Sequence, residues 1–223
     1  MTDAHCHVAR GQGRFFICDP APAEGGEGDV RFIGFHPWEF LAGETLDGAR
    51  LEALQARLVA NPRLGVGEIG LDRLRVREIP AGMRSAFEAQ LGVAAELGRP
   101  VVLHGAKCWG QVVRACAPYR GRLPALVFHG FSRSGGLLPE LLALGGYVTV
   151  TPAILNDHAV NYRELVKKLP LARLLVESDC TPDTPEGAPG AREVAARLAA
   201  LLGIPLAELE AQLEANADRV RPR

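Results

Sequence analysis

The sequence lacks the segments that mark membrane-bound and exported proteins. None of its apolar runs approaches the roughly 20 residues that cross a bilayer, and no basic stretch followed by an apolar segment opens the chain. Its five cysteines are odd in number and form no CxxC pair, so they do not fit a disulfide framework. Free thiols of this kind suit a reducing compartment. We therefore expect a cytoplasmic protein with no membrane partner.

The sequence also lacks an excess of charge of either sign. The formal net charge of 223 residues is -1, which gives no global basic field to attract nucleic acid, so any recognition of phosphate must be local. Repeats and low-complexity tracts are absent from the sequence as well. A hydrophobic content of 48% is enough for a large core, and α/β barrels of this length often form one domain. We expect a single domain over residues 1–223.

Apolar runs bounded by turn residues predict eight strands, most of them followed by a helix. The expected strands are Thr2 to His7, Phe15 to Cys18, Val30 to Phe35, Leu64 to Ile69, Val101 to Leu103, Ala125 to Phe128, Gly146 to Val150 and Leu174 to Glu177. The expected helices span residues 49–60, 83–97, 110–116, 137–144, 162–169, 191–202 and 205–217. This alternation predicts an α/β fold, a (β/α)8 TIM-type barrel.

Two connections depart from the alternation. Only residues 8–14 separate the first two expected strands, too few for a helical crossover of a dozen or so residues. Residues 20–29 are rich in Pro and Gly and carry no helical periodicity. We expect the crossover helices after strands 1 and 2 to be missing or reduced. The uncovered outer face of strands 1–3 would then need the C-terminal helices or a partner subunit, in a homodimer, to cover it.

Two histidines end the first expected strand. His5 and His7 are two residues apart, and side chains on a strand alternate faces with period two, so both imidazoles point the same way. Such a pair can chelate one metal ion. The alternative is a chance pair near a terminus or the remnant of a tag, but a tag would be a longer histidine run followed by a linker.

Polar side chains recur at the carboxyl ends of the expected strands. They are His5, His7, His36, Glu68, His104, His129 and Asp179. In a barrel these ends converge on one mouth, where the chemistry is built. One histidine at such a place is more often structural or solvated, but five of them with two carboxylates are hard to explain by solvation. Burying so many polar groups without partners would cost several kcal/mol, which metal ions would offset.

Seven short segments occur in order along the chain. They are DAHCH from Asp3, GFHPW from Gly34, GEIGLD from Gly67, PVVLHG from Pro100, FHGFS from Phe128, LLVESDCTPDTP from Leu174 and NADRV from Asn216. Together they resemble the motifs of the TatD-type metal-dependent deoxyribonucleases, a family of amidohydrolase-like barrels. The resemblance implies an enzyme, a metal-dependent hydrolase of ester bonds. Its most direct form is a two-metal phosphodiesterase that trims DNA as an exonuclease.

The same resemblance implies a cofactor of two divalent metal ions. His5, His7 and Asp179 resemble the ligands of the first ion, Glu68 resembles the bridge, and His104 with His129 resembles the second set. Nitrogen-rich coordination favours Zn²⁺ or Mn²⁺, although the family is also described with Mg²⁺. Two ions about 3.5 to 4 Å apart lower the pKa of a shared water. Asp179 is either the base for that water or only a ligand.

Departures from the family motifs concern the substrate. The family commonly has a serine and an arginine after the histidine of strand five, where this chain has Gly105-Ala106-Lys107. Lys107 could reach phosphate as a point charge but cannot reproduce an arginine fork. Arg133 follows FHGFS where glycine is frequent and is a candidate replacement cation. Arg73 follows GEIGLD where an aromatic residue is often found.

His36 and Asp72 each allow two interpretations. His36, in the GFHP turn, either contacts substrate or is a structural turn histidine. Asp72 either orients a ligand histidine or caps its loop.

Three functions remain open from the sequence. The first is a nuclease acting on DNA or another phosphodiester. The second is a dinuclear-metal hydrolase of a non-nucleic-acid ester, amide or phosphoester, which the lost arginine allows. The third is a metal-binding protein without turnover, against which the complete ligand set argues.

Overall fold

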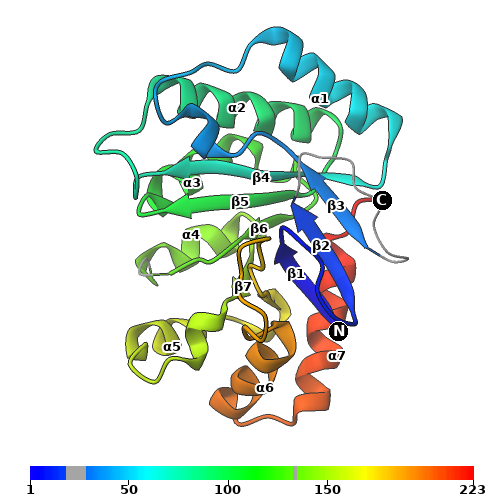
Figure 1. Ribbon diagram of the computed structural model, residues 1–223, viewed down its shortest axis with the longest axis vertical. Coiled ribbons are helices and arrows are strands. Elements are labelled where there is room, and N and C mark those ends of the chain that lie inside the picture. Colours follow the sequence, from blue (N-terminus) through cyan, green and yellow to red (C-terminus); the bar gives the residue numbers. More distant parts are fainter. Residues whose placement is uncertain (19–28, 133–134) are drawn as a thin grey trace.

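The computed structural model describes residues 1–18, 29–132 and 135–223, and within these ranges eight parallel strands form a nearly closed barrel (Figure 1). The strands are β1 (Thr2–Cys6), β2 (Arg14–Cys18), β3 (Val30–Ile33), β4 (Leu64–Asp72), β5 (Val101–Ala106), β6 (Leu126–Phe128), β7 (Tyr147–Val150) and β8 (Leu174–Val176). Each strand pairs in parallel with the next, in the order of the sequence. The predicted (β/α)8 barrel is therefore confirmed.

Helices occur in the chain from the connection between β3 and β4 onward, and they line the outside of the barrel. They are α1 (Gly48–Ala60), α2 (Ala81–Glu96), α3 (Trp109–Cys116), α4 (Leu138–Ala143), α5 (Val160–Val166), α6 (Ala191–Leu202) and α7 (Leu206–Val220). Short 3-10 turns are η1 (Pro37–Phe40), η2 (Ala117–Tyr119), η3 (Gly135–Leu137), η4 (Pro152–Leu155) and η5 (Leu171–Arg173). The local sequence sets helix ends: Asp47 caps α1 by accepting the N–H of Arg50, and Gly203, with φ 68°, ends α6.

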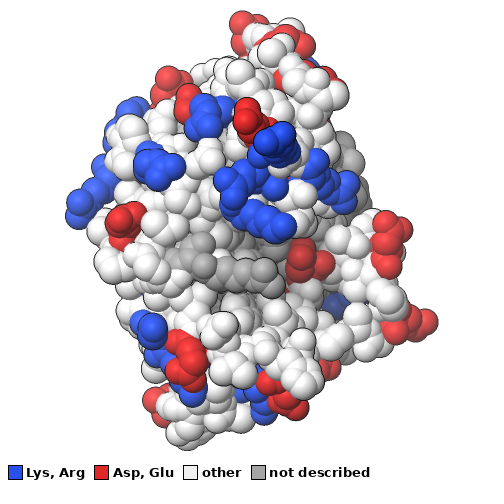
Figure 2. All heavy atoms as spheres, turned by 90° about the vertical axis from the view of Figure 1, so that its left-hand side faces the viewer, with Lys and Arg blue, Asp and Glu red and all other residues white. Residues whose placement is uncertain are grey.

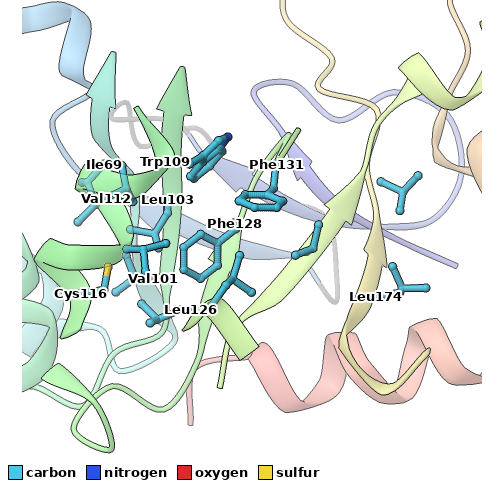
Figure 3. Packing of buried hydrophobic residues seen from close by; sticks show 14 of the residues in the cluster. Ile69, Val101, Leu103, Trp109, Val112, Cys116, Leu126, Phe128, Phe131 and Leu174 are labelled. Atoms are coloured by element: carbon cyan, nitrogen blue, oxygen red, sulfur yellow. The ribbon is translucent and has the colours of Figure 1, made fainter. Parts of the chain in front are cut away.

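Two apolar layers support the mouth of the barrel. Val101 and Leu103 of β5 pack outward, in one cluster with Val112 and Cys116 of α3 (Figure 3). Val102, between them, belongs to the cluster inside the barrel. Each fully buried side chain of this size contributes roughly 1.5 to 3 kcal/mol. Because side chains alternate along a strand, the residue after Leu103 returns to the inside, directly above this packed floor.

The barrel closes between β8 and β1 at its carboxyl end. The N–H of Asp179 donates to the carbonyl of His5 at 3.1 Å, and the N–H of His7 donates to the carbonyl of Cys180 at 2.7 Å. One carboxylate oxygen of Asp3 accepts the N–H of Ser178 at 2.9 Å. These bonds join the segment after β8 to the end of β1. They bring together at the mouth residues that are about 175 positions apart in the sequence, such as Asp3 and Ser178.

Strand ends differ from the sequence prediction where they approach the mouth. β4 continues to Asp72 instead of ending at Ile69, because Gly70 and Asp72 pair with β5. A Cβ at Gly70, where φ is 153°, would lie 2.0 Å from the carbonyl oxygen of His104, so this pairing requires glycine. β1 ends at Cys6 and β3 at Ile33, both earlier than expected. His7 is therefore positioned by its bond to the segment after β8 and not by strand alternation.

The expected gap in the helical layer is present after β1, where residues 7–13 contain no helix. The second expected gap falls mainly on residues 19–28, outside the described residues. On the outer face of β2, Phe15 and Ile17 are only 8% and 5% exposed, in a cluster with Cys6 and Cys180, and α7 contacts β1. The described ranges therefore need no second subunit there, and nothing in them supports the homodimer. They also contain no helix long and apolar enough to span a bilayer.

Candidate metal centre at the barrel mouth

The candidate site is built around one buried carboxylate, Glu68 of β4, which is 5% exposed. One of its oxygens lies 3.5 Å from Nε2 of His5 and 3.5 Å from Nε2 of His7. The other lies 2.6 Å from Nδ1 of His104 and 3.6 Å from Nε2 of His129. These histidines come from the ends of β1, β5 and β6. A carboxylate with imidazoles at both oxygens has the arrangement of a bridging ligand.

Asp179 approaches the same centre from the end of β8. Its Oδ1 lies 3.5 Å from Nε2 of His5, and its side chain is 46% exposed. The backbone of Asp179 is left-handed, with φ 53°, which is uncommon for a residue other than glycine and costs energy. The bond from its N–H to the carbonyl of His5 holds this conformation. Asp179 thus combines a place at the centre with access to solvent.

Three sets of ligand atoms lie close enough to share an ion, each set within 4.8 Å. They are His5, His7 and Glu68; His5, His129 and Asp179; and His36, Glu68 and His104. This grouping differs from the assignment by resemblance, which paired His129 with His104. The rings of His5 and His129 are 3.9 Å apart, whereas those of His104 and His129 are 6.1 Å apart.

His5 provides the test of whether a metal fits. Its side chain is 0% exposed, and neither Nδ1 nor Nε2 has a hydrogen-bond partner among the described residues. An unsatisfied buried polar group costs about 1 to 3 kcal/mol. A divalent ion bound to one of the ring nitrogens would remove that nitrogen's share of the penalty. Imidazole and carboxylate donors together suit ions such as Zn²⁺ and Mn²⁺, so the residues present fit a divalent metal.

The histidines of β5 and β6 are held by carboxylates behind them. Nε2 of His104 lies 3.1 Å from Asp72, and Nδ1 of His129 lies 3.0 Å from both oxygens of Glu177. Burial alone would lower the pKa of each histidine. Instead, bonds to Asp72 and Glu68 raise the pKa of His104 to about 8, and the charges of Glu177 and Glu68 raise the pKa of His129 to about 10. Such carboxylates fix the orientation of a metal-binding imidazole.

The carboxylates of the centre are ionised at neutral pH. Burial alone would raise the pKa of Glu68, but His129, His5 and His104 hold it well below its ordinary value. Burial alone would also raise the pKa of Asp179, but the nearby His5 and His129 lower it below its usual range. Ionised carboxylates are the form that binds metal ions.

His36 and Asp72 each make both kinds of contact considered from the sequence. Nδ1 of His36 accepts the N–H of Trp38 and so caps η1, while its Nε2 lies 3.8 Å from Glu68. Burial lowers the pKa of His36 to about 4, so its ring is neutral at physiological pH. Asp72 faces His104 and also accepts the N–H of Leu74 at 2.6 Å, which shapes the loop after β4.

The candidate cations lie at the rim. Lys107, between β5 and α3, is exposed, has a left-handed backbone with φ 56° and lines the cleft that contains His104, His129 and Asp179. Arg133 lies outside the described residues. The cleft has a volume of ≈ 1590 Å³, larger than the roughly 300 to 1,000 Å³ of a small-molecule pocket. It can therefore admit a substrate larger than a metabolite.

Sequence reasoning gave no role to Glu177. The structure places it at 0% exposure beneath His129, and it also accepts the N–H of Gly130 at 3.1 Å. A signal was present, because a charged residue directly follows the apolar strand Leu174–Val176. Trp38 was likewise seen only as part of a motif, yet its Nε1 donates to Asp72 at 2.7 Å.

The sequence is similar to that of known proteins. A model of the family described as TatD related DNase matches residues 24–221. The 3'-5' ssDNA/RNA exonuclease TatD of Edwardsiella piscicida is 35% identical over 147 residues, which is 66% of this chain and 55% of the relative. Its counterpart in Klebsiella pneumoniae is 33% identical over 148 residues, with the same coverage. The chain thus spans about half the length of the curated relatives it matches.

Solved structures are similar to this chain over nearly its full length. The crystal structure of YjjV, a TatD homologue from Escherichia coli K12, is 27% identical, has a TM-score of 0.83 and covers 99% of this chain and 97% of that one. A TatD family hydrolase from Entamoeba histolytica has a TM-score of 0.74 over 99% of this chain and 97% of its own, but at 15% identity it shows the fold alone.

Proposed function

This chain belongs to the TatD-related DNase family, and from that premise we propose that it is a metal-dependent hydrolase that cleaves phosphodiester bonds of nucleic acids. The observation that carries the proposal is the position of Glu68, buried between imidazoles at both of its oxygens. The names of the curated relatives, 3'-5' ssDNA/RNA exonucleases, support single-stranded DNA or RNA as the substrate and an exonuclease as the type of activity.

We propose that two divalent ions are held by His5, His7, Glu68, His104, His129 and Asp179, with Glu68 between them. Ions held by these residues would supply a nucleophile at neutral pH and a positive contact for a phosphoryl oxygen. Asp179 is ionised and half-exposed at the rim, so we assign it the proton of the attacking water. Asp72 and Glu177 keep the rings of His104 and His129 in place during turnover.

The substrate contacts are proposed from the rim. Lys107 projects from the loop after β5, where a point charge can hold a phosphate, and His36 lies beside the centre as a neutral hydrogen-bonding group. Arg133 remains a proposed cation on sequence grounds. We further propose that residues 1–223 act as one catalytic domain. The five buried free cysteines support a cytoplasmic location.

The test compares the wild type with Glu68→Ala, using metal analysis and hydrolysis of single-stranded DNA and bis(p-nitrophenyl) phosphate. We expect about two bound ions and metal-dependent cleavage in the wild type. Losing the bridge should remove several kcal/mol of transition-state stabilisation, which is roughly 10³-fold in rate. Glu88→Ala, on the exposed face of α2, is the matched control and should keep both metal and activity. Unchanged cleavage in Glu68→Ala would refute the proposal.

A second candidate is a dinuclear-metal hydrolase of a non-nucleic-acid ester, amide or phosphoester. It is favoured by Gly105-Ala106-Lys107, which replaces the serine and arginine common in the family. Hydrolysis of small esters or amides without cleavage of oligonucleotides would favour this candidate. Bound ions without turnover of any substrate in a broad panel would point instead to a metal-binding protein.

A further inference from the structure

One aromatic side chain and three arginines lie beside the mouth but outside the proposed ligand set. Trp38, in η1, is 46% exposed. The loop after β4 carries Arg73, Arg75 and Arg77, all of them exposed. The guanidinium carbon of Arg75 lies 3.8 Å from the centre of the Trp38 ring, in cation–π contact. We call these four residues the Trp38 rim.

The Trp38 rim is fixed to the metal centre through Asp72, which is 1% exposed. Nε1 of Trp38 donates to Oδ2 of Asp72 at 2.7 Å, and the N–H of Leu74 donates to Oδ1 at 2.6 Å. The same Oδ2 lies 3.1 Å from Nε2 of His104. One buried carboxylate therefore sets the position of the aromatic ring, the arginine loop and a proposed metal ligand together.

The surface between the rim and the centre is continuous. Leu74, between Arg73 and Arg75 in the sequence, is 60% exposed and lines the same cleft as His104 and Lys107. The ring of Trp38 also makes an edge contact with His36, at 4.8 Å between centroids. A chain-like substrate lying on the rim would therefore lead directly into the cleft.

The charges of the rim arginines are not neutralised by ion pairs within the described ranges. Arg14, Arg50 and Arg163 are each paired with a carboxylate. Within the described ranges, none of the three rim arginines forms an ion pair. Figure 2 faces the carboxyl ends of β4 and β5, and it shows basic side chains gathered in the upper half, which contains β4 and α2, and mixed charges below. The three rim arginines thus place positive charge without ion-pair partners in the described ranges beside the mouth of a protein of net charge -1.

We propose that the Trp38 rim is a docking track for single-stranded nucleic acid, in which Trp38 stacks on a base and the arginines contact phosphates. The proposal rests on the proposed function, because the track leads to the centre where cleavage would occur. A stacking ring among cations is the chemistry that binds single strands without sequence preference. A duplex keeps its bases stacked on one another, so it offers Trp38 no face and binds only through its phosphates.

The first test removes the charge of the track. Binding of a phosphorothioate oligothymidylate of about 12 nucleotides, which resists hydrolysis, is measured by anisotropy between about 50 and 200 mM salt. Each phosphate contact on a single strand contributes about 0.7 to the slope of log K against log salt. The triple variant R73Q/R75Q/R77Q should therefore lose about 2 from this slope. An unchanged slope would overturn the role of the arginines.

A matched control removes the same charge from the other end of the barrel. Arg63 directly precedes β4, and Arg120 and Arg122 precede β6; all three are exposed. Arg122 also lies over an aromatic ring, that of Tyr119, at 5.5 Å. The variant R63Q/R120Q/R122Q should keep the wild-type slope. An equal loss of slope in both triple variants would show that the overall charge of the protein, and not the position of the arginines, determines the salt dependence. This result would also overturn the track.

The second test separates stacking from the support of Asp72. Trp38→Phe keeps a stacking face but loses the N–H donor, whereas Trp38→Ala loses both. We expect Trp38→Ala to weaken binding roughly tenfold and Trp38→Phe to lose much less. Binding should also quench the emission of Trp38, since the other tryptophan, Trp109, is 5% exposed. Equal losses in the two variants without quenching would show that Trp38 only supports Asp72.

Failure of the track and failure of the proposed function are distinguishable. One outcome is that the phosphorothioate oligonucleotide binds with the full salt slope, while the protein cleaves neither the ordinary phosphodiester oligonucleotide nor bis(p-nitrophenyl) phosphate. The proposed function would then be wrong and the track would stand. If both are cleaved and R73Q/R75Q/R77Q binds and cleaves the oligonucleotide like the wild type, the track is wrong and the function stands.

Discussion

The histidines on the two sides of the mouth are held in different ways. His104 and His129, from β5 and β6, each have a buried carboxylate behind the ring, Asp72 and Glu177 respectively. His5, from β1, has no hydrogen-bond partner at either nitrogen within the part of the chain that the structure describes. The β5–β6 side is therefore arranged by the protein itself, whereas the β1 side carries a penalty that a bound ion would reduce.

The two sides also differ in how their strands are anchored. β5 lies between two neighbouring strands and beneath α3. β1 is fastened at its opposite end, where Glu214 of α7 accepts the N–H of Thr2 and pairs with the guanidinium of Arg14. The placement of His5 thus depends on polar contacts at the far end of its strand and on the closure to the segment after β8.

The largest effect should come from His5→Leu. We expect hydrolysis to fall at least about 10³-fold, because a proposed metal ligand is lost. The metal-free protein should nevertheless be nearly as stable as the wild type, since two buried nitrogens without hydrogen-bond partners in the described residues disappear. Urea unfolding in the presence of a chelator measures the second effect, with His158→Leu, at an exposed histidine, as the control. A large loss of metal-free stability would contradict this view of β1.

On the other side, His129→Leu should destabilise the metal-free protein by about 3 to 5 kcal/mol, because Glu177 would be left as an unpaired buried charge. Replacing Glu177 by Leu as well should recover much of the loss. The N–H of Gly130 would keep its second partner, Thr149, in that double variant. Urea unfolding in the presence of a chelator measures this change as well. Equal changes in metal-free stability for His5→Leu and His129→Leu would contradict the contrast between the two sides of the mouth.

Smaller effects should follow from the supporting carboxylates. Asp72→Asn and Glu177→Gln keep the shape of each side chain but lose its charge, and each should weaken metal affinity or activity about 10- to 100-fold. Metal titration followed by calorimetry gives the affinity. Asp157→Asn, which removes an exposed carboxylate that pairs with Arg163, is the control and should change neither. Full affinity in both variants would show that the rings hold their orientation without carboxylates.

The smallest effect should come from the far end of β1. Arg14 and the amino terminus lower the pKa of Glu214, against the opposite action of burial. A carboxyl group with a lowered folded-state pKa stabilises the protein above its unfolded value, 4.5, and loses this contribution as the pH falls below it. Glu214→Gln should cost less than about 1 kcal/mol at neutral pH, since the pair is partly exposed. Thermal unfolding at pH values near 7 and below 4 should show the wild type and variant converge in acid.

The sequence predicts the barrel because its signals are local. Apolar runs such as 101–103 and 126–128 mark strands, and polar residues at their ends mark the mouth, so His5, Glu68 and Asp179 could be brought to one place by topology alone. The extension of β4 to Asp72 was missed, because it depends on the close approach of Gly70 to β5, a contact with no local signature.

The supports of the histidines could not be predicted in the same way. Glu177 and His129 are 48 positions apart, and nothing in either neighbourhood specifies which side chain the other will meet. The same holds for the grouping of His129 with His5 across the barrel, which depends on its closure between β8 and β1. Residue types and strand ends predict membership of a site, but pairwise distances within it require the folded chain.

Asp72 joins two events that would otherwise be independent. Its carboxylate is shared by His104, Trp38 and the N–H of Leu74, so a strand that changes the position of Trp38 alters the support of an imidazole at the metal centre. Thermodynamic reciprocity then applies: any factor by which a docked strand changes the affinity of the centre for an ion is the factor by which the ion changes the affinity for the strand. If the proposed track and metal centre are both present, substrate binding and metal binding would form one linked equilibrium.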